Sequence, residues 1–199
     1  MRIALILGPY RPGACGVSDY ARLLGEKLEG KGHSCQRINI DRDLGSTFSS
    51  LTDNVPEADL ISLQFAPYAF SPNGLSGSAL LKFGQAVRNR NLQVMFHEIW
   101  IGAYPKAKIK EKVLGWRQKR EILKFVKLLN PSVAFGTNSA AIDRLRREGI
   151  HAEYLYLFGN IPYSRIPAGS KKECFRVAFF GTAYENFPYE LLATRLKRI

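Results

Sequence analysis

The sequence predicts an α/β fold in which a parallel sheet carries helices on both faces, and two observations support it. First, short apolar runs alternate along the chain with longer segments whose apolar residues recur every three or four positions, as in strands joined by helices. Second, the first run, residues 2–7, is almost uninterrupted and leads through a glycine- and proline-rich loop into a helical pattern. Such a run fits a strand covered on both faces.

Each expected strand is a short apolar run bounded by turn residues, and each expected helix shows apolar residues at helical spacing. The first helix starts at Val17 and stops at Gly30, and Ser139 is the expected cap of a later one. Residues 66–73 are expected to form a loop rich in aromatic residues and proline. The strands are expected at 2–7, 34–40, 59–65, 92–96, 132–135 and 152–157. Further helices are expected at 75–89, 106–129 and 139–148, with a short one near 48–51.

Length and composition indicate an ordinary globular protein. The chain has 199 residues, of which 46% are hydrophobic and 23% charged, which excludes a disordered chain. No apolar run approaches the ~18–20 residues of a membrane span, and the first run ends at Gly8, too early for a signal-peptide core. We therefore expect a cytoplasmic protein.

Cysteines and histidines give no sign of a metal or disulfide framework. The three cysteines lie far apart, and His33, His97 and His151 form no cluster with acidic residues at metal-site spacing. We expect no metal and no cofactor. The net charge of +12 instead indicates an anionic partner: nucleic acid, a lipid surface or a phosphorylated substrate.

A glycine-rich loop joins the first strand to the first helix. This geometry directs backbone N–H groups and a helix N-terminus at an anionic or sugar ligand. Gly8, Gly13 and Gly16 follow the spacing G-x4-G-x2-G, which is neither a dinucleotide motif nor a P-loop. A simple strand-to-helix turn therefore remains an alternative to a ligand loop.

In a parallel sheet of this kind, ligands bind beyond the carboxyl ends of the strands. Four segments are expected at that edge: the glycine-rich loop and the residues 66–73, 97–104 and 137–138. These four segments are the candidate site on geometry alone.

The expected helix at 106–129 is strongly basic. Two interpretations remain open. The segment is either an amphipathic helix packed on the sheet with a solvated charged face, or a helix that binds an anionic membrane surface. Only Glu111 and Glu121 oppose its basic residues, which are Lys106, Lys108, Lys110, Lys112, Arg117, Lys119, Arg120, Lys124 and Lys127. Its expected apolar stripe comprises Ile109, Val113, Trp116, Leu123 and Val126.

The last forty residues predict a second domain. Residues 159–174 contain two prolines and a Gly-Ser pair, as expected of a linker. Residues 175–199 begin again as a strand, a glycine and a helix, and one strand and one helix cannot enclose a core. We expect a first domain at 1–158, a linker at 159–174 and the truncated start of a second domain at 175–199.

Several short motifs occur in an order that resembles a known family. Residues 13–21 read GACGVSDYA, a Gly-His pair ends the first helix, and His97-Glu98 follows the fourth strand. Residues 158–162 lead into the expected linker, and residues 177–181 form the apolar run that opens the expected second domain. The order resembles the N-terminal domain of family 4 glycosyltransferases with the GT-B fold, built from two Rossmann-like domains. Cys15 replaces the first glycine of the usual Gly-Gly pair, and the Glu-x7-Glu motif that holds the donor is not in this chain.

The resemblance implies a hexosyltransferase that moves a sugar from a nucleotide-sugar donor to a glycan or lipid-linked acceptor. It implies retention of configuration and a role in polysaccharide biosynthesis. If the basic helix at 106–129 binds an anionic membrane, we expect a peripheral place at the inner face of that membrane. His97 matches the histidine that assists catalysis, and Gly13, Gly16 and Val17 match the loop that faces the donor diphosphate. These 199 residues alone, without most of the donor-binding residues, are expected to be inactive.

Other site candidates remain open between two roles. Asp19 is either an acceptor-side carboxylate or a first-turn partner of the helix dipole, and Glu98 either orients His97 or caps the next element. Tyr68 and Tyr104 are candidates for stacking on a sugar ring, with rim packing as the alternative, and Asn138 is a further acceptor-side candidate.

Two other functions compete with sugar transfer. A catalytically inactive GT-B-like module would bind a glycan or a partner. A basic α/β domain would bind nucleic acid, but the chain has no recognisable nucleic-acid-reading motif and its charge is concentrated on one helix. We therefore expect no nucleic-acid partner.

Overall fold

The computed structural model describes residues 1–40, 57–75, 77–159 and 189–196. The chain divides into two compact units, Met1–Pro162 and Tyr163–Ile199. The second unit contributes one described helix, α7 (Tyr189–Leu196), inside the helix expected at its end. The expected strand at 175–182, the helix near 48–51 and nearly all of the linker lie outside the described residues.

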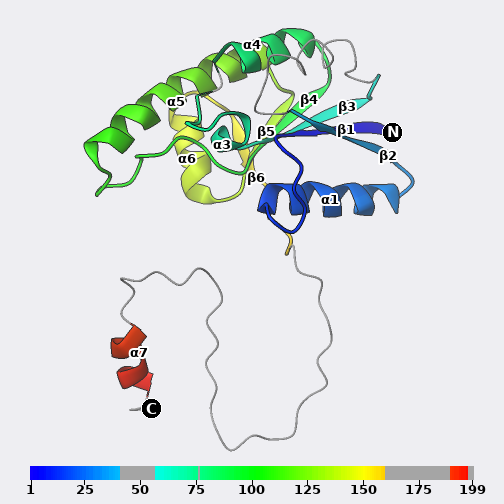
Figure 1. The fold of residues 1–199 in the computed structure, drawn as a ribbon. Helices are drawn as coiled ribbons and strands as arrows, with labels where there is room; N and C mark the ends of the chain where they lie inside the picture. The colour runs from blue at the N-terminus through cyan, green and yellow to red at the C-terminus, as the bar shows by residue number, and fades with distance from the viewer. Residues whose placement is uncertain (41–56, 76, 160–188, 197–199) are drawn as a thin grey trace, which may run out of the picture. The chain divides into compact units, whose positions relative to one another are not determined.

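The first unit is built on a parallel sheet of six strands, which confirms the predicted α/β, Rossmann-like class (Figure 1). The strand order is β2-β1-β3-β4-β5-β6, so β1 lies between β2 and β3, and the chain then adds strands on one side only. The strands are β1 (Arg2–Leu7), β2 (Ser34–Asn39), β3 (Leu60–Phe65), β4 (Leu92–Phe96), β5 (Val133–Gly136) and β6 (Ala152–Tyr154).

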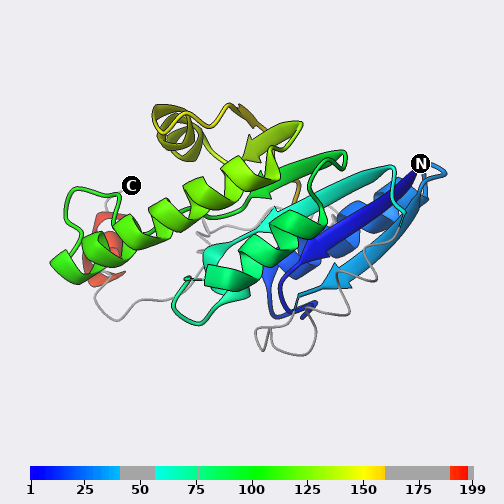
Figure 2. The ribbon, with the colours of Figure 1, turned by 90° about the horizontal axis from the view of Figure 1, so that it is seen from above.

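Helices cover both faces of this sheet. Figures 1 and 2 show α4 and α5 over one face and α1 and α6 over the other. The helices of this unit are α1 (Gly16–Glu29), α3 (Pro67–Phe70), α4 (Gly77–Ala86), α5 (Ile109–Leu129) and α6 (Ser139–Arg147).

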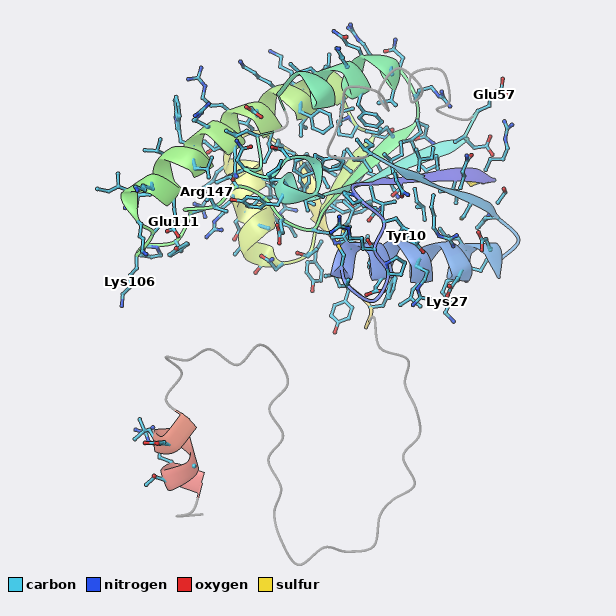
Figure 3. All side chains as sticks on the ribbon, in the orientation of Figure 1. Tyr10, Lys27, Glu57, Lys106, Glu111 and Arg147 are labelled. Carbon is cyan, nitrogen blue, oxygen red and sulfur yellow. The ribbon has the colours of Figure 1, made fainter. Side chains whose placement is uncertain are left out.

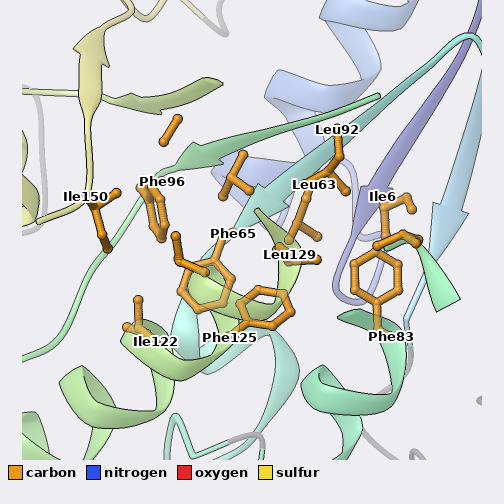
Figure 4. Packing of buried hydrophobic residues seen from close by; sticks show 14 of the residues in the cluster. Ile6, Leu63, Phe65, Phe83, Leu92, Phe96, Ile122, Phe125, Leu129 and Ile150 are labelled. Carbon is orange, nitrogen blue, oxygen red and sulfur yellow. The ribbon is translucent and has the colours of Figure 1, made fainter. Parts of the chain in front are cut away.

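Aromatic rings fill the core between the sheet and α4 and α5 (Figure 4). The ring of Phe65 on β3 lies 5.4 Å from that of Phe96 on β4, 5.6 Å from Phe70 on α3 and 5.9 Å from Phe125 on α5. Burying one Phe side chain contributes about 1.5–3 kcal/mol. Because strand residues alternate between the two faces of the sheet, Ile6 of β1 packs in this core with every second residue of the neighbouring strands.

Two local expectations were wrong. The segment expected to be a loop at 66–73 contains the single-turn helix α3, which has Pro67 at its first position, where a missing N–H costs nothing. Asn138, not Ser139, caps α6: it has extended backbone, and its side chain accepts a hydrogen bond from the N–H of Ala141 at 2.8 Å.

The predicted apolar stripe of α5 was also wrong in its first half. Ile109, Val113 and Trp116 are 81%, 56% and 53% exposed. Each helical residue turns by about 100°, so these three lie nearly opposite the inward side chains. The residues that α5 buries are Gly115, Gln118, Ile122, Phe125, Val126 and Leu129.

Gly115 allows α5 to approach the loop that precedes it. A Cβ at this position would overlap the carbonyl oxygen of Ile101, so backbone would have to move. We expect Gly115→Ala to lower the free energy of unfolding by about 1–3 kcal/mol, as overpacked sites do. Urea unfolding followed by circular dichroism measures this loss.

Gly30→Ala is the matched control. Gly30 has right-handed backbone, and a Cβ there would stand at ordinary contact distance from Glu26, 3.4 Å. This variant should change the free energy of unfolding by less than about 0.5 kcal/mol. Equal stabilities of the two variants would contradict a close approach of α5 to Ile101.

Candidate functional site

A cavity of about 440 Å³ opens at the carboxyl edge of the sheet. Its walls come from segments that follow β1, β3, β4 and β6, which is where ligands bind in such sheets. Two larger hollows, of about 560 and 650 Å³, lie around Asn130, before β5 begins, and so at the other edge. The residues lining the carboxyl-edge cavity are Cys15, Gly16, Val17, Tyr20, Ala66, Tyr68, Ala69, His97, Glu98, Leu157 and Phe158.

The first turn of α1 shapes the glycine-rich loop in front of it. The N–H of Arg11 donates to Ser18 Oγ at 2.9 Å, and Ser18 Oγ donates to the carbonyl of Pro9 at 3.2 Å. The N–H of Gly13 donates to Asp19 Oδ1 at 2.9 Å, and Gly13 has φ +79°, which glycine adopts without strain. These bonds fold the loop back onto α1 and fix where the helix begins.

The N-terminus of α1 forms one wall of the cavity. Cys15 is the N-cap, and its side chain makes no capping hydrogen bond, while Gly16 and Val17 line the cavity. A helix N-terminus carries about half a positive charge and presents backbone N–H groups. An anionic group is therefore the chemistry that this wall suits.

His97 forms another wall, directly after β4. Its backbone N–H continues the sheet by donating to the carbonyl of Phe65 at 2.9 Å. The rings of Tyr20 and His97 pack in a T-shaped arrangement, with ring centroids 5.0 Å apart. Burial lowers the pKa of His97 from 6.5 to about 4, so the ring is neutral at physiological pH.

A chain of side-chain amides sets the tautomer of His97. Gln64 and Gln93 both donate through Nε2 to Ser62 Oγ at 2.9 Å. The Oε1 of Gln64 is therefore the atom that faces His97 Nε2, at 2.9 Å. Because an amide oxygen only accepts, His97 Nε2 carries the proton and Nδ1 keeps the lone pair.

Aromatic rings complete the cavity. Tyr20 stacks on Phe158 with ring centroids 4.6 Å apart and 15° between the planes. Tyr68, on α3, receives a hydrogen bond on its hydroxyl from Nε2 of Gln118, a fully buried residue of α5, at 3.3 Å. Aromatic faces of this kind suit the apolar face of a sugar ring or a nucleobase.

The structure brings together five of the residues that the sequence singled out: Gly16, Val17, Tyr68, His97 and Glu98 all line the cavity. That coincidence is the arrangement the sequence predicts for a site at the carboxyl edge. The roles assigned to these five residues stay predictions.

Four other candidates lie outside the cavity lining. The N–H of Gly13 in the loop donates to the carboxylate of Asp19, which lies in the first turn of α1, a contact that the sequence did not predict. The hydroxyl of Tyr104 donates to Glu111 at 2.6 Å on the exposed side of the protein, and Asn138 caps α6. Their proposed contacts with a ligand stay predictions.

Sequence reasoning placed Cys15 in the candidate glycine-rich loop but missed Tyr20, Leu157 and Phe158 as lining residues. Tyr20 was detectable, because it lies one helical turn after Gly16 and so shares its face. The last two follow the end of β6, and the carboxyl-edge rule applies to that strand as well. In the described part of the chain, no three His, Cys, Asp or Glu side chains lie close enough together to hold a metal ion.

No family model matches the chain, and no curated protein matches it. Among solved structures, the chain is similar to an alpha-glucosyltransferase in complex with UDP and a 13-mer DNA containing an HMU base, with 14% identity and a TM-score of 0.52. This match covers 78% of the chain and 41% of the enzyme.

A second match is an alpha-glucosyltransferase in complex with UDP-glucose and DNA containing an abasic site: 12% identity, TM-score 0.50, covering 77% of the chain and 42% of the enzyme. A putative NADH-flavin reductase from Streptococcus pneumoniae matches with 17% identity and a TM-score of 0.43, and the match covers 69% of the chain and 70% of the reductase. This likeness is too low to carry an argument. The chain thus spans about two fifths of the glucosyltransferases that it matches. At these identities the likeness shows a glycosyltransferase-like fold and leaves membership of family 4 a prediction.

The low pKa of His97 predicts an acid-sensitive fold. As pH falls through 6.5, an unfolded imidazole gains a proton while folded His97 stays neutral down to about 4. The unfolded state then binds more protons than the folded state. The contribution of neutral His97 to stability is therefore complete above pH 6.5 and is lost as the pH falls toward about 4. The free energy of unfolding should fall by up to about 3 kcal/mol across this window.

Urea unfolding at a series of pH values measures this slope. His97→Gln should lose it, whereas His151→Gln, at an exposed position, should keep it. An unchanged slope in His97→Gln would show that another group causes the acid sensitivity.

The tautomer of His97 is directly testable by nitrogen NMR. We expect the Nε2–H form in the wild type, because Gln64 accepts that proton. Gln64→Leu should allow both tautomers, and Gln64→Glu should raise the pKa of His97, because a carboxylate then faces the ring. Gln85→Leu, on the exposed side of α4, is the matched control, and the Nδ1–H form in the wild type would refute the assignment.

Proposed function

We propose that residues 1–158 form the acceptor-side lobe of a nucleotide-sugar-dependent glycosyltransferase with two Rossmann-like lobes. The linker at 159–174 leads to the second lobe, which starts at 175. The observation that carries the proposal is that the N-terminus of α1 and His97 share one cavity at the carboxyl edge. The glycosyltransferase-like fold supports it.

The chemistry of the cavity suits the parts of a nucleotide sugar. During transfer, the bond from the anomeric carbon to the diphosphate oxygen breaks, and the acceptor oxygen bonds to that carbon and passes its proton to the departing diphosphate. The departing diphosphate is an anion, which the N-terminus of α1 stabilises. The Tyr20–Phe158 pair offers an apolar surface and keeps water out.

His97 has the protonation state that this reaction needs. Its Nε2 proton is engaged by Gln64, so Nδ1 is the atom that can accept a hydrogen bond from a sugar or acceptor hydroxyl. As a neutral ring, it orients that hydroxyl without repelling the cationic character that develops on the sugar. Glu98, at the same edge, is an acceptor-side carboxylate in this proposal.

The matched enzymes support the donor class. Their complexes hold UDP or UDP-glucose, so we propose a nucleoside diphosphate sugar as the donor, hexosyl transfer with retention, and no separate cofactor. Family 4 membership and a role in polysaccharide biosynthesis belong to the same proposal. The 199 residues alone should neither transfer the sugar nor hydrolyse the donor.

The acceptor is proposed to be a glycan or a lipid-linked sugar. The matched enzymes' complexes also contain DNA, and the charge of +12 would suit it, so DNA is the second candidate acceptor. An inactive binding module would keep the cavity and bind a glycan without any donor. Donor binding separates that module from the enzyme lobe.

Titration of the 199-residue chain with UDP tests the proposal by NMR. We expect shifts at Gly16, Val17 and His97, with weak, roughly millimolar affinity, because one lobe supplies only part of the site. Uridine without phosphates should shift α1 less. Shifts confined to the basic residues of α5 and α6 would indicate non-specific charge binding and contradict the proposal.

Val17→Glu places a carboxylate at the N-terminus of α1 and should weaken UDP binding by about tenfold or more. Ala140→Glu is the matched control, because it places the same charge in the first turn of α6, at an exposed position outside the cavity lining. Equal losses in both variants would assign the effect to overall charge.

A further inference from the structure

The outer face of α5 carries exposed apolar side chains that the fold does not use. Ile109, Val113 and Trp116 are spaced i, i+4 and i+7, so they form one stripe along the first two turns. The buried side of the helix, with Gln118 and Ile122, lies nearly opposite. We call these three residues the α5 outer stripe.

Basic side chains flank the α5 outer stripe. The guanidinium of Arg120 lies over the ring of Trp116, with its Cζ 4.8 Å from the ring centroid. Lys119 is engaged by Glu148 at 2.9 Å. The exposed basic residues of this segment are Lys106, Lys108, Lys110, Lys112, Arg117, Arg120, Lys124 and Lys127.

The acidic residues of α5 do not interrupt the stripe. Glu111 and Glu121 lie roughly 200° and 120° around the helix from Ile109. Glu111 also accepts hydrogen bonds from the hydroxyl of Tyr104 at 2.6 Å and the N–H of Lys108 at 2.8 Å. The outward face is therefore apolar at its centre and positive at its margins.

We propose that the outer face of α5 docks on an anionic phospholipid surface. Helices that lie in a membrane interface combine basic residues with Trp and aliphatic side chains, and their apolar face enters the boundary between headgroups and acyl chains. Each basic residue near such a surface adds electrostatic attraction. Among the described residues, no helix is long and apolar enough to cross a membrane.

The stripe distinguishes a lipid surface from nucleic acid. Duplex DNA is bound through phosphate contacts from basic side chains, which give Ile109 and Val113 no partner. A lipid interface buries both while the lysine stems extend to the headgroups. Exposed apolar side chains beside basic ones therefore favour a lipid surface over nucleic acid.

The first turns of α5 lie at the same edge of the sheet as the cavity. Figures 1 and 2 show α5 beginning on the carboxyl-edge side of the sheet, which is the side of the cavity. In Figure 3, Lys106 lies at this end of the molecule and Lys27 of α1 lies far from it. The inference does not rest on the proposed function, because binding to vesicles requires no donor.

Vesicle flotation of the 199-residue chain tests the inference, with vesicles of pure phosphatidylcholine and vesicles with roughly 30% phosphatidylserine. At about 0.1 M salt the chain should bind the anionic vesicles and not the neutral ones, and binding should weaken as salt rises. The protein has two tryptophans. Trp116 is exposed and Trp100 is 9% exposed, so a blue shift of the emission that disappears in Trp116→Phe reports insertion at the stripe.

Two variants separate the apolar and charged contributions. Ile109→Ser/Trp116→Ser should lower the partition coefficient about tenfold or more, and Lys110→Gln/Arg117→Gln should lower it severalfold and reduce its salt dependence. The matched controls are Tyr156→Ser, at an exposed aromatic outside α5, and Lys27→Gln/Lys31→Gln, at exposed lysines of α1 and the turn after it. Both should bind vesicles as the wild type does.

Three results would overturn the inference: no binding to anionic vesicles, equal binding to neutral and anionic vesicles, or wild-type binding by Ile109→Ser/Trp116→Ser. Duplex DNA is the decisive competitor. DNA binding that survives Ile109→Ser/Trp116→Ser, is lost in Lys110→Gln/Arg117→Gln and displaces the vesicles would assign this face to nucleic acid instead.

Discussion

Parallel pairing of the strands is the constraint on which the rest of this structure depends. Six strands that run the same way end at the same edge, so the segments that follow them meet there although they lie far apart in the sequence. This is how Gly16 and His97 come to face one cavity. Parallel pairing also requires a crossover after each strand, and these crossovers supply the helices that cover the sheet.

Two buried amides convert this general arrangement into a defined site. Gln64 lies with Ser62 on a strand whose other residues are apolar, and it orients the imidazole of His97 through its oxygen. Gln118 lies on the inner face of α5 and holds the Ile101 N–H, the Asn73 carbonyl and the Tyr68 hydroxyl. A buried amide is costly unless it is satisfied, so both side chains specify where their partners stand as well as stabilising them.

Most of the fold was predictable from the sequence, because strands covered on both faces must be apolar at nearly every position. The run that ends at Leu7 is such a case. The site was only partly predictable: the carboxyl-edge rule identified His97 and Tyr68, but nothing local marks Phe158 as a stacking partner of Tyr20. The first half of the inner face of α5 escaped prediction, because it contains Gly115 and Gln118, which hydrophobic periodicity does not count as apolar.

The three hydrogen bonds of Gln118 have a consequence for how this chain tolerates change over evolution. They tie the axial position of α5 to the wall that holds Tyr68. The side of this helix that carries Gln118 is therefore constrained in sequence by the partners that it must reach. Among homologues, the residues of α5 should therefore vary unevenly around the helix axis. The positions that vary least should lie on the side of the helix that supports the pocket.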